Sequence, residues 1–130
     1  MSTEQAPFRV LVVDDERIIA DSLVLILRGR GFDSRAAYSG EDAVEQALAW
    51  NPHAVIADVV MGKMDGVALA IFLAKTLPSC KVLLMSGNIA TERLLNESKK
   101  LGHDFPIVAK PFNPDSILEF LGQPGDIGTT

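Results

Sequence analysis

Short apolar runs alternate with segments of helical periodicity along nearly the whole chain. Each run has the length of a buried strand and ends abruptly at polar or turn-forming residues. In the first helical segment, apolar residues recur every three or four positions, and two glycines then end the pattern. The pattern predicts strands at residues 8–13, 33–38, 54–57, 81–85 and 106–109. It also predicts helices at residues 17–30, 41–50, 65–76, 91–101 and 115–121.

Strands that alternate with helices run parallel, because each helix carries the chain back to the edge where the next strand starts. The order of elements therefore predicts an α/β fold, a doubly wound parallel sheet with helices on both faces. The strand expected at 33–38 is the most polar of the five, which indicates an edge position. We expect one domain at residues 8–121, a disordered N-terminus at 1–7 and a flexible tail at 122–130.

Polar residues follow four of the predicted strands at the point where each strand ends. Asp14 and Asp15 follow the first strand, Asp58 the third, Ser86 the fourth and Lys110 the fifth. In an open parallel sheet these ends lie along one edge, and ligands bind outside that edge. Three carboxylates, a hydroxyl and an ammonium at one edge predict a magnesium-dependent phosphoryl site with Asp58 as the nucleophile.

In this order, these residues resemble the receiver domain of two-component response regulators. The resemblance covers residues 8–121 and rests on the polar residues just described, on Met-x-x-Met-Asp-Gly after Asp58, and on Pro111 after Lys110. Each motif is short, but the complete set at these strand ends is highly specific. The resemblance implies a flavodoxin-like (βα)5 fold with strand order 2-1-3-4-5. It also implies a cis bond between Lys110 and Pro111.

The resemblance further implies a role for each site residue. Asp58 would be the phosphoacceptor, and Asp14 and Asp15 would hold Mg²⁺ with it. The backbone carbonyl of Val60 would be a further metal ligand. Ser86 and Lys110 would bind phosphoryl oxygens, completing the site: Asp14, Asp15, Asp58, Val60, Ser86 and Lys110.

Two positions depart from the family pattern. Gly62 stands where the family usually has proline, which predicts a more mobile loop after Asp58. Ile107 stands where the family usually has tyrosine or phenylalanine, three residues before Lys110. That aromatic side chain normally reports phosphorylation to partners by turning inward, so the departure bears on the switch and not on the chemistry.

Composition narrows the partners and the compartment. The formal net charge of −5 argues against binding to nucleic acid or to an anionic membrane. Cys80 is the only cysteine, so the chain can form no internal disulfide. No apolar run has the length of a membrane span, and the first residues carry no signal-peptide pattern. We expect a cytoplasmic location.

The sequence is thus interpreted as a stand-alone receiver that takes a phosphoryl group from a histidine kinase or a histidine phosphotransfer protein. Its output would pass through contact with an unknown downstream protein, and it would be no enzyme beyond catalysing its own phosphorylation and dephosphorylation. A phosphohydrolase would need an acid at Val60, and a flavin module would not place Asp14 and Asp15 in its phosphate loop. A degenerate receiver that binds partners without phosphorylation stays open, as does a fragment of a longer regulator or hybrid kinase.

Overall fold

The computed structural model describes residues 7–87, 96, 99–100, 102, 105–110 and 113–122. The strands are β1 (Arg9–Val13), β2 (Asp33–Ala37), β3 (Ala54–Asp58), β4 (Lys81–Ser86) and β5 (Ile107–Ala109). The helices are α1 (Arg17–Gly29), α2 (Gly40–Trp50), α3 (Gly66–Thr76) and α5 (Pro114–Leu121). All these bounds agree with the sequence predictions to within one residue. Most of the helix expected at 91–101 lies outside the described residues, as does Pro111.

The five strands form one sheet in the order β2-β1-β3-β4-β5, and every neighbouring pair is parallel. This order confirms the fold class and the edge position of β2. The order reverses at β1, which lies between β2 and β3. Because Val13 of β1 pairs with Ala57 of β3, the residues that follow them, Asp14 and Asp58, lie side by side at the carboxyl edge of the sheet.

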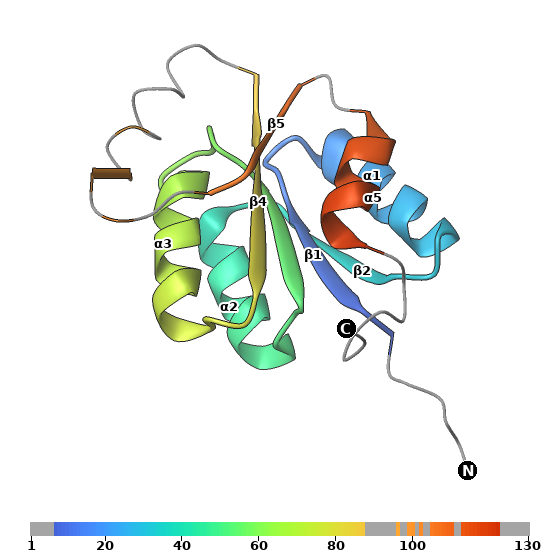
Figure 1. The fold of residues 1–130 in the computed structure, drawn as a ribbon, viewed down its shortest axis with the longest axis horizontal. Coiled ribbons are helices and arrows are strands. Elements are labelled where there is room, and N and C mark those ends of the chain that lie inside the picture. Colours follow the sequence, from blue (N-terminus) through green and yellow to red (C-terminus); the bar gives the residue numbers. More distant parts are fainter. Residues whose placement is uncertain are drawn as a thin grey trace.

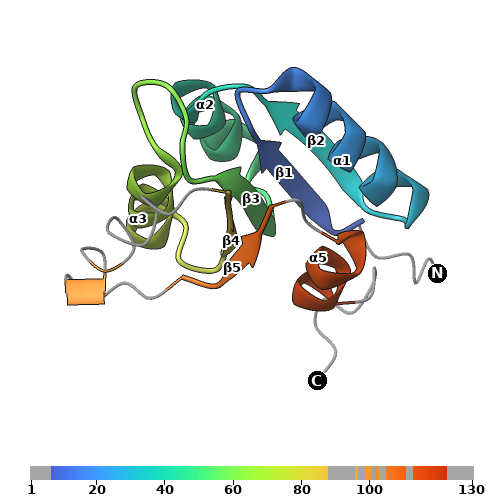
Figure 2. The same cartoon turned by 90° about the horizontal axis from the view of Figure 1, so that it is seen from above.

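Helices cover both faces of the sheet (Figure 1). The helices α1 and α5 pack on one face, and α2 and α3 pack on the other; Figure 2 shows the same layers from above. Side chains of β1 alternate between the two layers, as the pleat of a strand requires. Val10 and Val12 belong to the core under α1 and α5, while Leu11 and Val13 belong to the core under α2 and α3.

Three of the helices begin at a residue whose side chain caps the first turn. Ser39, Asp65 and Asn113 accept hydrogen bonds from the backbone N–H groups of Asp42, Ala68 and Asp115. The N-cap residue of α1, Glu16, makes no side-chain cap bond. Among the described residues, no helix is long and apolar enough to cross a membrane.

Candidate functional site

Asp14 is a fully buried carboxylate at the end of β1. Its oxygens are satisfied by the protein: Oδ1 accepts the backbone N–H of Glu16 at 3.0 Å, and Oδ2 accepts the Lys110 ammonium at 3.0 Å. Its own N–H donates to the carbonyl of Ala37 at 3.1 Å. A buried charge persists only where it is paired and hydrogen-bonded, and Asp14 meets both conditions.

Asp58 is the last residue of β3, with 7% of its surface exposed. Burial raises the pKa of its carboxyl group. The charge of Lys110 opposes that rise, the charge of Asp14 adds to it, and a hydrogen bond from the backbone of Val60 opposes it. Asp58 is thus a carboxyl group with a raised pKa beside other acidic side chains, a combination that is typical of functional sites.

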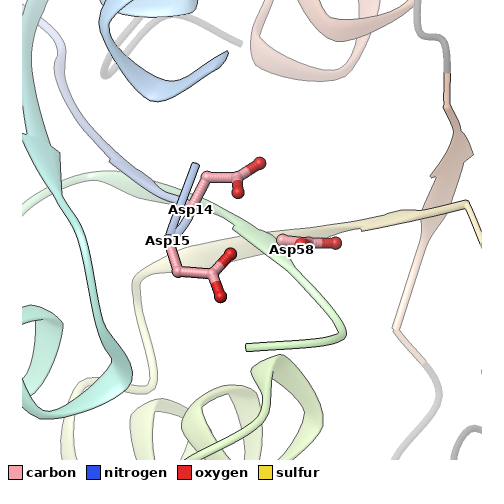
Figure 3. A group of neighbouring side chains, drawn as sticks. All are labelled: Asp14, Asp15 and Asp58. Carbon is pink, nitrogen blue, oxygen red and sulfur yellow. The ribbon is translucent and has the colours of Figure 1, made fainter. Parts of the chain in front are cut away.

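Asp15 is exposed and completes a group of three carboxylates. One ligand oxygen each from Asp14, Asp15 and Asp58 lies within 4.8 Å of the others, and Figure 3 shows the three side chains converging from the ends of β1 and β3. Carboxylate oxygens are the ligands that Mg²⁺ prefers, usually one or two of them together with water and phosphate oxygens. The group therefore fits the metal that the sequence predicted, and it could hold one ion.

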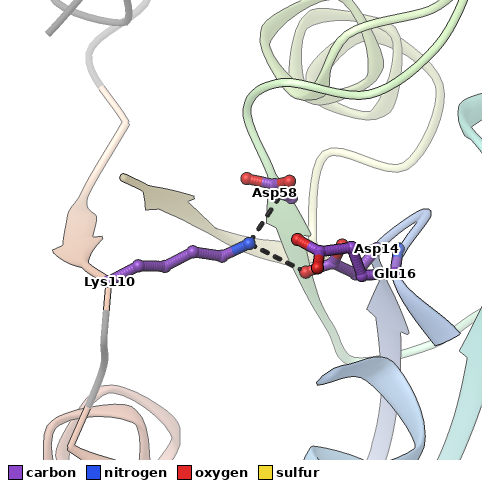
Figure 4. A network of polar contacts seen from close by, with 4 residues as sticks. All are labelled: Asp14, Glu16, Asp58 and Lys110. Atoms are coloured by element: carbon purple, nitrogen blue, oxygen red, sulfur yellow. Dashed lines mark hydrogen bonds and ion pairs between the residues drawn. The ribbon is translucent and has the colours of Figure 1, made fainter. Parts of the chain in front are cut away.

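Lys110 directly follows β5, and its side chain extends to this cluster (Figure 4). Its ammonium lies 3.0 Å from Asp14 Oδ2 and 3.3 Å from Asp58 Oδ2. Its backbone N–H donates to the carbonyl of Ser86 at 2.8 Å, which holds the end of β5 against the end of β4. Burial lowers the pKa of the Lys110 ammonium, but the hydrogen bond to Asp14 and the charge of Asp58 outweigh burial and leave that pKa above its ordinary value.

The remaining two predicted site residues lie at the same edge. Ser86 ends β4 and is partly buried. Val60 follows Asp58 by two residues, and its side chain is 49% exposed. The described contacts thus bring Asp14, Asp58 and Lys110 into direct contact and Asp15 into the cluster. The roles expected for the Ser86 hydroxyl and the Val60 carbonyl stay predictions.

Sequence reasoning missed the steric role of Gly66. A Cβ atom at Gly66 would lie 2.3 Å from the carbonyl oxygen of Asp58, and the Gly66 N–H donates to the carbonyl of Val59 at 2.8 Å. The start of α3 therefore packs against the backbone of Asp58, at a distance that only glycine allows. The Asp-Gly pair in the sequence signalled a helix start, but not this close contact.

A second glycine, Gly40, supports the loop that follows Asp58. A Cβ atom there would lie 2.7 Å from the Cβ of Met64. The first turn of α2 is thus in close contact with the segment between β3 and α3. The two glycines thus allow close contacts on either side of the loop that includes Gly62, and the greater mobility expected for this loop stays a prediction.

A doubly wound sheet with an acidic cluster and a lysine at its switch point defines a receiver-type signalling domain. The profile of the response regulator receiver domain family matches residues 10–121. The chain belongs to this family, whose members are signalling domains of two-component systems.

Individual relatives agree with the family match. The chain is 33% identical over 121 residues to the chemotaxis protein CheY of Treponema pallidum, covering 91% of this chain and 83% of that protein. It is 33% identical to the transcriptional regulatory protein ZraR of Salmonella typhimurium, covering 86% of this chain and 25% of ZraR. The chain thus spans only about a quarter of some of the regulators that it matches.

Solved structures show the same architecture. A response regulator of Chloroflexus aurantiacus superposes with a TM-score of 0.76 at 30% identity, covering 89% of this chain and 95% of that one. The response regulator TrrA of Thermotoga maritima, solved in complex with Mg²⁺ and BeF, superposes with a TM-score of 0.75 at 28% identity, covering 87% and 95%.

Proposed function

We propose that Asp58 accepts a phosphoryl group from a phosphohistidine of a histidine kinase or a histidine phosphotransfer protein. The observation that carries the proposal is the convergence of Asp14, Asp15, Asp58 and Lys110 from separate strand ends. In the transfer, an Asp58 oxygen forms a bond to phosphorus while the phosphorus–nitrogen bond of the donor breaks. The donor imidazole nitrogen keeps the electron pair and takes up a proton.

The acidic cluster would hold Mg²⁺ through Asp14, Asp15, Asp58 and the carbonyl of Val60. A bound Mg²⁺ ion supplies positive charge where a carboxylate and a phosphoryl group crowd together. The TrrA structure, which contains Mg²⁺ and BeF, supports this assignment. Lys110 would follow the new negative charge from Asp58 to a phosphoryl oxygen, where a charge-assisted hydrogen bond forms. The Ser86 hydroxyl would donate to another oxygen.

The partner would dock on the carboxyl edge and on the outer face of α1. Ile18 and Leu25 of α1 are 82% and 67% exposed. They lie seven residues apart, which places them on one face of the helix, about two turns from one another. This apolar stripe suits a helix of the phosphodonor. Output would pass through protein contact in the cytoplasm, and the net charge of −5 makes nucleic acid an unsuitable target.

Phosphorylation from a small donor tests the proposal without knowledge of the kinase. With acetyl phosphate and Mg²⁺, the protein should gain the mass of one phosphoryl group, and Asp58→Asn should abolish the gain. Asp65→Asn is the matched control, because asparagine also caps α3 and should leave labelling unchanged. Undiminished labelling of Asp58→Asn would refute the assignment. A wild-type protein that never labels would favour a receiver that binds partners without phosphorylation.

A further inference from the structure

Helix α1 starts with a residue that its position does not favour. Arg17 is the first residue of α1, and the first turn contains no acidic side chain. The N-terminus of a helix carries a partial positive charge, so a cation there is unfavourable. Arg17 also follows the exposed Asp15 by only two residues, and a long flexible side chain at that distance could reach its carboxylate.

The Arg17 guanidinium is held elsewhere. Its Cζ lies 4.2 Å from the centre of the Tyr38 ring, a cation–π contact. The Tyr38 hydroxyl donates to Oδ1 of Asp21 at 2.6 Å, and Asp21 lies one turn along α1 from Arg17. Within the part of the chain that the structure describes, no ion pair joins Arg17 to Asp15 or Glu16.

We propose that Tyr38 is a positioning residue for the metal site. Its ring, fixed by Asp21, holds the Arg17 guanidinium away from Asp15 and leaves that carboxylate for Mg²⁺. Asp14 and Asp58 are buried, so Asp15 is the one ligand of the cluster that is open to this competition. The inference rests on the metal site of the proposed function. It adds to that site a positioning role for Tyr38, the residue that follows β2.

The size of the effect follows from the strength of an exposed ion pair. The free energy of such a pair, expressed as a change in a binding constant, is a factor of about two to five. If Arg17 paired with Asp15, Mg²⁺ would have to displace it. Tyr38→Leu, which removes the ring, should therefore weaken Mg²⁺ binding by about two- to fivefold.

A double-mutant cycle on the full chain tests this inference. Mg²⁺ affinity is measured from backbone amide shifts in a titration at constant ionic strength, without phosphodonor. Tyr38→Phe keeps the ring, so its Mg²⁺ affinity should lie closer to that of the wild type than the affinity of Tyr38→Leu does. Removing the cation in Arg17→Gln should cancel the defect, so that Arg17→Gln/Tyr38→Leu binds as tightly as Arg17→Gln.

A surface variant keeps the inference testable if Tyr38→Leu does not fold. Lysine is more strongly hydrated than arginine and stacks less well on a ring, so Arg17→Lys should bind Mg²⁺ more weakly than Arg17→Gln. Equal Mg²⁺ affinities of Arg17→Lys and Arg17→Gln would overturn the inference. It would also be overturned if Arg17→Gln/Tyr38→Leu bound Mg²⁺ as weakly as Tyr38→Leu alone. A wild-type protein that does not bind Mg²⁺ would overturn the proposed metal site itself, and this inference with it.

Discussion

Nζ of Lys110 lies 3.0 Å from Oδ2 of Asp14, although 96 positions separate the two residues in the chain. The same ammonium lies 3.3 Å from Oδ2 of Asp58. The Lys110 ammonium therefore compensates the charges of both buried carboxylates. A Mg²⁺ ion bound as proposed would compensate the same charges, so Lys110 and the metal would partly substitute for one another in stabilising the fold.

Lys110→Met should expose this substitution. Breaking a buried pair leaves a carboxylate uncompensated, and because the Lys110 side chain is 17% exposed, we expect a loss of about 1–3 kcal/mol of unfolding free energy in chelator, below the range for fully buried pairs. Saturating Mg²⁺ should restore most of the loss, and the variant should bind Mg²⁺ more tightly than the wild type. Urea denaturation with chelator and with Mg²⁺ measures both effects. Lys63→Met, in the exposed loop, is the control, and equal stability of Lys110→Met and wild type in chelator would contradict the prediction.

The raised pKa of Asp58 predicts a pH-dependent cost in stability. Because the folded-state pKa of Asp58 lies above the unfolded-state value of 3.8, the folded state binds more protons between the two values. Unfolding free energy therefore falls as pH rises through that window, and the cost is complete above the folded-state pKa. In chelator, Asp58→Asn should be more stable than the wild type at neutral pH, and the difference should shrink as pH falls towards 3.8. Denaturation curves at several pH values measure this, and a difference that grows on acidification would reverse the sign of the argument.

The sequence brought the candidate site residues to one edge because each lies at the end of a predicted strand. Asp14, Asp58 and Lys110 are recognisable as the polar residues that end apolar runs, and parallel pairing is sufficient to bring such residues to one edge. The same reasoning predicted the strand order only through the family resemblance. Hydrophobic periodicity alone does not say which strands are neighbours.

Contacts that depend on loop geometry could not be predicted in this way. The approach of Gly66 to the Asp58 carbonyl depends on how the chain turns from β3 into α3. The stacking of Arg17 on Tyr38 joins the start of α1 to the residue that follows β2, and the pairing of β1 with β2 brings the two together. Periodicity carries no information on either distance, because both depend on how the ends of neighbouring elements are placed relative to one another.

Ser34 is a polar residue of the edge strand β2 whose side chain is fully buried. Among the residues that the structure describes, its hydroxyl has no hydrogen-bond partner. An unpaired buried hydroxyl is unfavourable, so Ser34→Ala should leave stability unchanged or raise it by up to ~1 kcal/mol. Ser39→Ala is the matched control, because it removes the α2 cap and should cost about 1 kcal/mol. Thermal denaturation of both variants decides, and a clear loss in Ser34→Ala would show that the hydroxyl is satisfied.

His53 predicts a loss of stability on mild acidification. Its Nδ1 accepts the backbone N–H of Arg9 at 2.8 Å, a bond that needs the neutral ring. Burial, and then the charge of Arg9, lower the pKa of His53 below 6.5. The unfolded state therefore binds more protons between the folded-state pKa and 6.5, and unfolding free energy falls as pH drops through that window. In His53→Gln, the unfolding free energy should depend less on pH in this window. If its slope below pH 6.5 equals that of the wild type, other groups cause the pH dependence.

Ile107 predicts a receiver that switches without turning a side chain inward. It begins β5 opposite Leu84, and its side chain is 45% exposed. A β-branched side chain on a strand is restricted at χ1, and isoleucine has no polar tip to exchange between core and solvent. Phosphorylation must therefore bias another element, since a signal requires two states with different contacts. We expect the largest changes in amide exchange at residues 87–95, which, apart from Gly87, lie outside the described residues.

Methyl NMR with Mg²⁺ and BeF as the phosphoryl mimic tests this switch. The Ile107 methyl groups should keep one rotamer when the mimic binds, while amide signals of residues 87–95 change. Asp58→Asn, which removes the proposed phosphoacceptor carboxylate, is the control and should show neither response. A change of rotamer at Ile107 with residues 87–95 unaffected would mean that Ile107 itself is the switch, because the mimic would then alter the β5 side chain without altering the segment that follows β4.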